Sequence, residues 1–189
     1  MEAWFAGVRS MLYAMIILVL AWSLSEITDV LHTAAYLVTM LGSWLNPAWT
    51  PAVVFLLAAA TAFSTGSSWG TMGILMPLLL PLAWGVIETN ALHRLDNIHI
   101  IAATVGCVLR GAVWGDHCSP ISDTTVLTSM AGGCDNIEHV RTQLPYALTV
   151  GLVSIGIGTL PAGYGVPVYV LYPIGIIILV AVHRYFGKP

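Results

Sequence analysis

Two short polar segments interrupt an otherwise apolar chain, and both are rich in oxygen-bearing side chains. The first is the octet at residues 64–71, which offers five hydroxyls and two glycines. The second is the stretch at residues 116–125, which carries two carboxylates and four hydroxyls. Hydroxyl, carbonyl and carboxylate oxygens are the ligands that hard cations prefer. Both segments are therefore candidates for binding a small cation.

The two carboxylates are the more informative feature, because a charge is costly away from water. Placing a carboxylate at the centre of a membrane helix costs at least about 2.5 to 3.5 kcal/mol, so such a group normally has a partner or a task. A carboxylate there can hold a proton or a sodium ion but not easily both, and this competition is sufficient for exchange. We expect Asp123 to alternate between the two ligands and Asp116 to tune or share that role.

The predicted cation and proton site draws on both segments. Its candidate ligands are carboxylate and hydroxyl side chains, namely Asp123, Asp116, Ser119, Ser122, Thr124, Thr65, Ser67 and Ser68, with Ser64 and Thr71 as secondary candidates. Within this set, we expect sodium to contact the two carboxylates together with Ser67 and Ser122.

These residues also have structural interpretations. Ser and Thr in membrane helices commonly bond their own backbone or pack against neighbouring helices. Asp123 is well placed to cap a helix that begins at Thr124. A zinc site would need four residues whose spacing is unlike that of zinc proteins, namely His117, Cys118, Cys134 and His139.

A hydrolase is a minor alternative. The segment Gly66 to Gly70 fits both G-x-S-x-G and G-x-x-x-G. A nucleophile elbow needs a strand before the serine, and the chain has no alternating strand pattern, so both matches are interpreted as accidental. A triad containing Asp116 and His117 would require adjacent side chains to face each other. A serine-reactive probe that labelled Ser68 would favour an intramembrane hydrolase.

Three further charged residues are secondary candidates. Arg110 lies six residues before Asp116, where it could pair with a carboxylate, attract an anionic substrate or extend to the membrane interface. Glu26 and Asp29 could line the same cavity, or could mark the end of a helix at the interface.

The composition indicates that lipid surrounds most of the chain. Of 189 residues, 58% are apolar and 8% are Asp, Glu, Lys or Arg, whereas about 25% are charged in a typical soluble domain. Residues 10–25, 33–87 and 142–182 contain no Asp, Glu, Lys, Arg or His. This pattern predicts a multi-pass protein of the cell membrane. Six scattered Lys and Arg exclude a nucleic-acid binder, and three unpatterned cysteines exclude a disulfide scaffold.

The elements that must position the two polar segments are helices. A crossing needs about 20 apolar residues, and the runs flanking residues 64–71 are shorter, so residues 52–85 are expected to form a re-entrant hairpin of two half-length helices. Its tip must line a cavity, because non-helical backbone in a membrane needs protein or water as a partner. Residues 98–131 are expected to form a broken helix, since Pro120 interrupts it.

The rest of the chain is expected to form one bent helix and two ordinary crossings. Residues 10–45 hold the first helix and an arm that either completes the crossing or lies obliquely. Residues 145–160 and 166–183 form the final crossings of a single membrane domain, residues 1–189. Arg9 followed by apolar residues could also indicate a signal peptide, but the following chain is equally apolar. The positive-inside rule places Arg141 and Arg184 in the cytoplasm.

Two long motifs resemble a known family. Residues 63–83, FSTGSSWGTMGILMPLLLPLA, and residues 115–148, GDHCSPISDTTVLTSMAGGCDNIEHVRTQLPYAL, are similar to signature stretches of NhaC-type sodium/proton antiporters, in the same order. The resemblance extends loosely over residues 21–45. It implies an all-α fold from a superfamily in which two inverted repeats each supply a re-entrant hairpin and a broken helix to a central site. The chain resembles the carboxy-terminal repeat only, and it contains no second copy of that repeat.

The resemblance implies a transporter rather than an enzyme, exchanging sodium ions for protons. Sodium and protons would be the transported species, and no cofactor is expected. A complementary half-transporter, or another copy of the same chain, would complete the site within the lipid bilayer. Two alternatives remain open. One is sodium-coupled exchange of a small organic anion or amino acid, which Arg110 suggests. The other is a non-transporting half-length membrane subunit that needs a partner chain.

Overall fold

The computed structural model describes residues 30–41, 45–92 and 96–186, together with isolated positions before residue 30. Every regular element among these residues is helical. Within these described ranges, five helices are long and apolar enough to cross a membrane: Pro47–Thr65, Ser68–Thr89, Ile98–Cys118, Asn136–Gly163 and Val168–Tyr185. The protein is therefore an all-α, multi-pass membrane protein, as the composition predicted.

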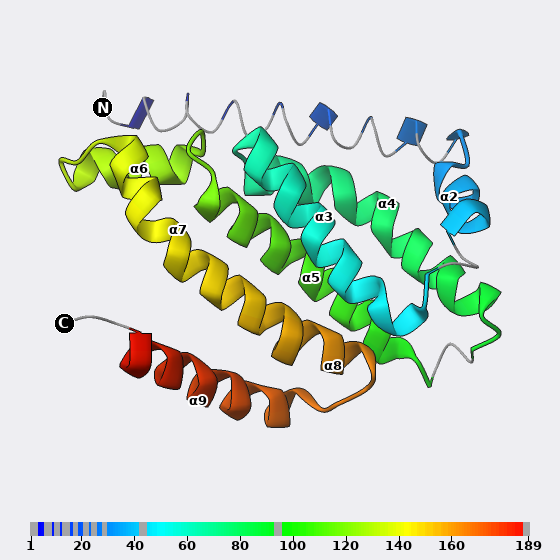
Figure 1. The fold of residues 1–189 in the computed structure, drawn as a ribbon. Coiled ribbons are helices and arrows are strands. Elements are labelled where there is room, and N and C mark those ends of the chain that lie inside the picture. Colours follow the sequence, from blue (N-terminus) through cyan, green and yellow to red (C-terminus); the bar gives the residue numbers. More distant parts are fainter. Residues whose placement is uncertain are drawn as a thin grey trace.

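Helices α3 (Thr50–Thr65) and α4 (Ser68–Thr89) form an antiparallel hairpin (Figure 1). A short 3-10 turn, η1 (Pro47–Trp49), precedes α3. The prediction that both arms are half-length is wrong, because the arms contain 19 and 22 residues. At a rise of about 1.5 Å per residue, such arms are about 29 and 33 Å long, which matches the hydrocarbon core. The hairpin tip consequently lies at one end of the bundle.

The hydroxyl residues around the tip explain the difference, because a cluster of Ser, Thr and Gly has the composition of a loop. Most of them lie within the helices. The Ser64 hydroxyl donates to the Ala60 carbonyl 2.8 Å away, and the Ser67 side chain caps α4 by accepting from the Gly70 amide at 3.2 Å. Only Gly66 and Ser67 leave the helical conformation, with Gly66 at a φ of 67°. Hydroxyls that bond the backbone one turn away allow a helix to continue through a polar segment.

Helix α5 (Ile98–Cys118) packs against both arms of the hairpin and forms a layer with them (Figure 1). The core of this layer includes Phe55, Leu79 and Val108, all at least 94% buried. Gly111 and Gly115 of α5 face α3 directly. A β-carbon at Gly111 would lie 2.5 Å from the Phe55 carbonyl oxygen, and one at Gly115 would overlap the Ala59 carbonyl. Small residues spaced by four allow helix backbones to approach closely in membranes.

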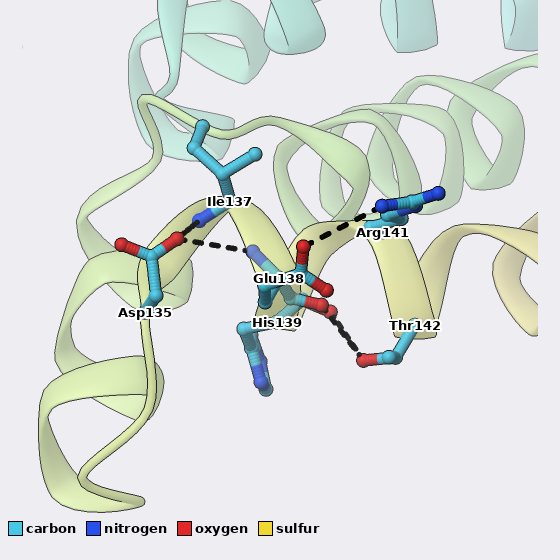
Figure 2. A network of polar contacts seen from close by, with 6 residues as sticks. All are labelled: Asp135, Ile137, Glu138, His139, Arg141 and Thr142. Carbon is cyan, nitrogen blue, oxygen red and sulfur yellow. Dashed lines mark hydrogen bonds and ion pairs between the residues drawn. The ribbon is translucent and has the colours of Figure 1, made fainter.

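Helix α6 (Asp123–Ala131) follows a four-residue break after α5, at the position where Pro120 predicted one. Next comes a long helix made of α7 (Asn136–Val153), the π-helical segment η2 (Ser154–Thr159) and α8 (Leu160–Gly163). This helix begins nine residues before the predicted crossing at 145–160. The early start is explained by Asp135, whose carboxylate accepts from the Ile137 and Glu138 amides at 2.9 and 3.2 Å (Figure 2).

Helices α9 (Val168–Phe186) and α2 (Thr33–Leu41) lie on opposite sides of the bundle (Figure 1). Helix α9 runs beside α7 and is largely exposed. Helix α2 packs on α4, where a β-carbon at Gly85 would overlap Val38. With nine residues, α2 is about 14 Å long, which is too short for a crossing. This length favours the oblique arm over a full crossing by residues 33–45; residues 42–44 lie outside the described residues.

Candidate functional site

The two polar breaks predicted from the sequence lie against each other. The Ser119 hydroxyl, at the end of α5, donates to the Phe63 carbonyl in the last turn of α3 at 2.7 Å. Gly66 packs on the same break, because a β-carbon there would lie 2.7 Å from the Ile121 carbonyl oxygen. Residues more than fifty positions apart therefore form one junction, at the end of the bundle where α6 also lies (Figure 1).

Asp116 is the buried carboxylate of this junction. Its side chain lies in the last turn of α5 and is 6% exposed. One oxygen, Oδ2, accepts a hydrogen bond from the Thr124 hydroxyl at 3.2 Å. The other, Oδ1, is buried without a hydrogen-bond partner among the described residues. A buried carboxylate oxygen without a donor is costly, so it is available to a proton or a cation.

The hydroxyls around Asp116 are ordered by the break itself. The Ser122 side chain is completely buried, caps α6 by accepting from the Thr124 amide at 3.2 Å, and lies 2.8 Å from the Thr124 hydroxyl. Thr125 follows, and its buried hydroxyl also has no hydrogen-bond partner among the described residues. Sequence analysis named Ser122 and Thr124 but missed Thr125, whose place in the same run of hydroxyls was the available signal.

Asp123 is exposed in the first turn of α6. A carboxylate at this position stabilises the helix by interacting with its positive end. The cap of α6 is Ser122 and not Asp123, so the capping role considered for Asp123 falls on its neighbour. Of the two carboxylates, Asp116 is therefore the buried one and Asp123 the exposed one.

The hydroxyls of the hairpin tip mainly serve the tip itself. Thr71 is 1% exposed and donates to the Ser67 carbonyl at 2.9 Å. The Thr65 hydroxyl lies 3.3 Å from that of Thr71 and 3.4 Å from the Ser67 carbonyl. Ser68 is partly buried at the start of α4. Of the tip residues, Ser67 thus lies in the hairpin turn and Ser68 begins α4, while Ser64 and Thr65 are exposed.

Two amide side chains of α7 donate hydrogen bonds to backbone carbonyls at the break, and sequence analysis missed both. Asn136 donates to the Pro120 carbonyl at 2.7 Å, and Gln143 donates to the His117 carbonyl at 2.8 Å. Carbonyls at a helix end have no partner within their own helix, so these amides satisfy groups that the break exposes. Their spacing of seven residues places them on one face of α7, and that spacing was a signal available in the sequence.

The remaining candidates lie elsewhere. Glu26 is exposed on a helix, and Asp29 is outside the described residues. Arg110 lies on a different face of α5, where it lines a separate cavity. Among the described residues, no group of three or more His, Cys, Asp or Glu could hold a metal ion, so the zinc alternative gains no support. The Gly66 to Gly70 segment joins two helices instead of a strand and a helix.

Comparison with known proteins gives the chain a family context. The sequence model of the Na+/H+ antiporter family matches residues 1–163. An uncharacterised protein of Haemophilus influenzae is 40% identical over 163 residues, which cover 86% of this chain and 29% of that protein. No solved structure matches the chain.

Two relatives with more specific names match shorter stretches. An uncharacterised Na(+)/H(+) antiporter of Haemophilus influenzae is 34% identical over 110 residues, covering 58% of this chain and 21% of the relative. An arginine/ornithine antiporter of Halobacterium salinarum is 36% identical over 112 residues, covering 57% and 21%. The alignments thus span between a fifth and a third of the length of these relatives.

Proposed function

This chain belongs to the Na+/H+ antiporter family, and we propose that it forms one half of a secondary transporter that exchanges sodium ions for protons. The observation that carries this proposal is the buried Asp116, whose Oδ1 has no hydrogen-bond partner among the described residues. This carboxylate lies where the break after α5 meets the hairpin turn, and non-helical backbone at helix ends supplies ligands for coupling ions in secondary transporters.

The exchange follows from competition at one carboxylate. With Oδ1 protonated, Asp116 is neutral, and the Thr124 hydroxyl still donates to Oδ2. With the proton lost, the negative charge attracts a sodium ion, and the hydroxyl of Thr124 beside the carboxylate, together with that of Ser122 2.8 Å from it, supplies neutral ligands. Moving the bare carboxylate through the membrane is the costly state. Each reorientation therefore carries either a proton or a sodium ion.

Asp123 assists this exchange from the exposed start of α6. Its negative charge raises the local concentration of cations at the mouth of the site. Ser67 and Ser68, which the sequence named as ligands, are proposed here as further ligands, because Gly66 of the same turn packs on the break after α5. Support for including the tip comes from the Ser119 to Phe63 hydrogen bond, which couples the tip to the carboxylate segment.

The proposal requires a second, complementary unit in the membrane. The chain covers 29% of the first relative's length, and α9 presents a largely exposed apolar surface. An inverted repeat, supplied by another chain or by a second copy, would close the site from the other side. In this arrangement α3 and α4 cross the membrane as ordinary helices with the tip at one face, because both have spanning length. A re-entrant course is the alternative.

Ion flux in proteoliposomes tests the function. Vesicles loaded with sodium and diluted into sodium-free buffer should acidify inside as sodium leaves and protons enter. A full-length relative reconstituted in the same way serves as the positive control. Vesicles with this chain alone, and vesicles with a co-expressed complementary half, separate a self-sufficient transporter from a split one. If neither preparation moves ions and the chain also fails to bind radioactive sodium, the proposed function is wrong.

A second candidate function is sodium-coupled exchange of a small organic anion or amino acid. It is favoured by the similarity to a relative named as an arginine/ornithine antiporter. Uptake of sodium that depends on an added organic substrate, at constant pH, would distinguish it from sodium/proton exchange.

A further inference from the structure

A cavity separate from the Asp116 junction lies between α5, the π-helical segment η2 and α9. Its volume is about 680 Å³, within the range of about 300 to 1,000 Å³ that small-molecule sites occupy. Most of its lining is apolar, including Val150, Ile157, Leu171 and Ile176, and Arg110 is the one residue of the lining that carries a permanent charge. A ligand with an apolar body and one negative charge would match this lining.

The guanidinium of Arg110 is oriented by its own helix. Its Nε donates to the Gly106 carbonyl at 3.1 Å, and one Nη lies 3.8 Å from the Cys107 sulfur. Gly106 leaves room for this arrangement, since a β-carbon there would lie 3.4 Å from the Arg110 Nη2. An arginine side chain has five N–H donors in a planar fork, so donors remain for a ligand in the cavity.

The orientation places the positive charge near the middle of a membrane-spanning helix. Arg110 points back toward residue 106, close to the centre of the 21-residue helix α5. Among the described residues, no carboxylate forms an ion pair with Arg110. Charged residues within membrane spans normally pair with an opposite charge or mark a substrate pathway. Arg110 is exposed within this chain, so its charge is accessible to an anion that enters the cavity.

We propose that this cavity binds a small organic carboxylate with an apolar body, and that the Arg110 guanidinium receives the carboxylate. Arginine pairs with carboxylates through two parallel hydrogen bonds, which fixes the orientation of the ligand. The apolar lining from α9 and η2 then covers the ligand's body. Because the guanidinium lies about 12 Å along the helix from the start of α5, at the depth of residue 106, a lipid headgroup at the membrane surface does not match it.

The segment η2 contributes to this site by its geometry. A π-helical turn inserts one extra residue per turn and frequently occurs at functional sites. Here Ser154, Ile157 and Gly158 of η2 line the cavity. A β-carbon at Gly158 would meet only the Ser154 hydroxyl, 4.0 Å away. Gly158 therefore leaves cavity space that a larger side chain would fill.

Binding of radioactive octanoate to the purified full chain in phosphatidylcholine nanodiscs tests the proposal. Octanamide, which has the same body without the charge, should compete poorly. We expect Arg110→Gln to weaken octanoate binding at least about tenfold, as loss of a charge-assisted pair would. The matched charge control is Arg141→Gln, because Arg141 lies outside the cavity and pairs with Glu138 at 3.5 Å (Figure 2). It should bind octanoate normally.

A second pair of variants tests the cavity without changing a charge. Gly158→Leu should abolish octanoate binding by filling the site, whereas Gly156→Leu should not, because Gly156 is outside the lining and has open space around it. Equal binding by Gly158→Leu and the unaltered chain would overturn the proposal. So would octanamide competing as well as octanoate, or loss of octanoate binding when phosphatidylglycerol is added, since that result would assign the cavity to an acidic lipid.

The role of the ligand as cargo rests on the proposed transport function, whereas the binding claim does not. Asp116→Asn provides the separation: it should remove sodium binding and leave octanoate binding unchanged. Octanoate bound normally by a chain that never binds sodium would leave the cavity proposal standing and reject the cation site. Sodium bound by a chain that never binds octanoate would leave the cation site standing and reject the cavity proposal.

Discussion

The two carboxylates of residues 116–125 differ in the environment that each receives. Asp116 is buried in the last turn of α5, where Thr124 of α6 donates to its Oδ2, and its Oδ1 is left without a hydrogen-bond partner among the described residues. Asp123 is one residue past the cap of α6 and faces outward. Sequence spacing cannot distinguish them, because both lie in the same polar segment, residues 116–125. Burial by a distant part of the chain makes the difference.

Replacing Asp116 by Asn should remove the exchangeable negative charge and lower sodium binding at least about tenfold, a loss of roughly 1.4 kcal/mol or more. Equilibrium binding of radioactive sodium measures this effect. Asp135→Asn is the control, because Asn caps a helix as well as Asp does and Asp135 is an exposed carboxylate that accepts from the Ile137 and Glu138 amides of α7. Equal sodium binding by Asp116→Asn and the unaltered chain would reject Asp116 as the ligand.

Ser119→Ala should destabilise the chain by about 1 to 3 kcal/mol, because it leaves the Phe63 carbonyl without its donor at a buried junction. Thermal unfolding in detergent would show a lower Tm. Ser64→Ala removes a hydroxyl that bonds its own helix on an exposed face, and it should change the Tm little. Similar Tm values for the two variants would mean that the Ser119 bond does not join the breaks.

At the scale of the elements, α5 packs closely against other helices on two of its faces. One face carries Gly111 and Gly115 against the backbone of α3, and another carries Trp114, whose indole donates to the Ala147 carbonyl of α7 at 2.8 Å. The Phe55 and Trp114 rings lie 5.7 Å apart between these faces. Helix α5 thus fixes the distance between α3 and α7. The site depends on that spacing, because Ser119 bonds α3 while Gln143 of α7 bonds His117.

Gly115→Ala should lower the stability by about 1 to 3 kcal/mol, the usual cost of overpacking, because the new methyl group would overlap the Ala59 carbonyl. Gly175→Ala makes the same chemical change on α9, where nothing lies within 4 Å of the added carbon, and should be tolerated. Thermal unfolding of both variants checks the close approach of α3 and α5. Tolerance of Gly115→Ala would show that these helices are further apart in the membrane.

For the whole molecule, the number of crossings fixes which side of the membrane each loop faces. A re-entrant hairpin and a pair of full crossings both return the chain to the side from which it entered. The orientation deduced from the positive-inside rule is therefore the same for either course of α3 and α4. Both place the loop between α6 and α7, and the end of α9, on the cytoplasmic side, where Arg141 and Arg184 are expected.

Native cysteines test this orientation without further mutations. Cys134 is exposed in the loop between α6 and α7, whereas Cys107 and Cys118 are buried. A membrane-impermeant maleimide should label inside-out vesicles and not right-side-out ones. Cys134→Ser should abolish the labelling, which identifies the reacting residue. Labelling of right-side-out vesicles at Cys134 would invert the topology.

The course of the hairpin needs one introduced cysteine. In a Cys134→Ser background, Ser68→Cys places a thiol at the start of α4, beside the tip. If α3 and α4 are ordinary crossings, the tip lies at the cytoplasmic face, and the maleimide should label this variant in inside-out vesicles only. Labelling from the opposite side would favour a re-entrant tip. So would the absence of labelling in vesicles, provided that the same folded samples label fully in detergent.

The sequence alone determined the membrane environment, the helical class, the family resemblance and the two polar segments, because composition and local chemistry decide these properties. It located the break at Pro120 for the same reason. It misjudged the arms of the hairpin, since hydroxyls that bond their own helix have the same composition as a loop. Only the tertiary structure decided which carboxylate is buried, how α7 amides satisfy the break, and that Arg110 faces a different cavity. Burial is a property of contacts between distant segments, and local sequence does not contain it.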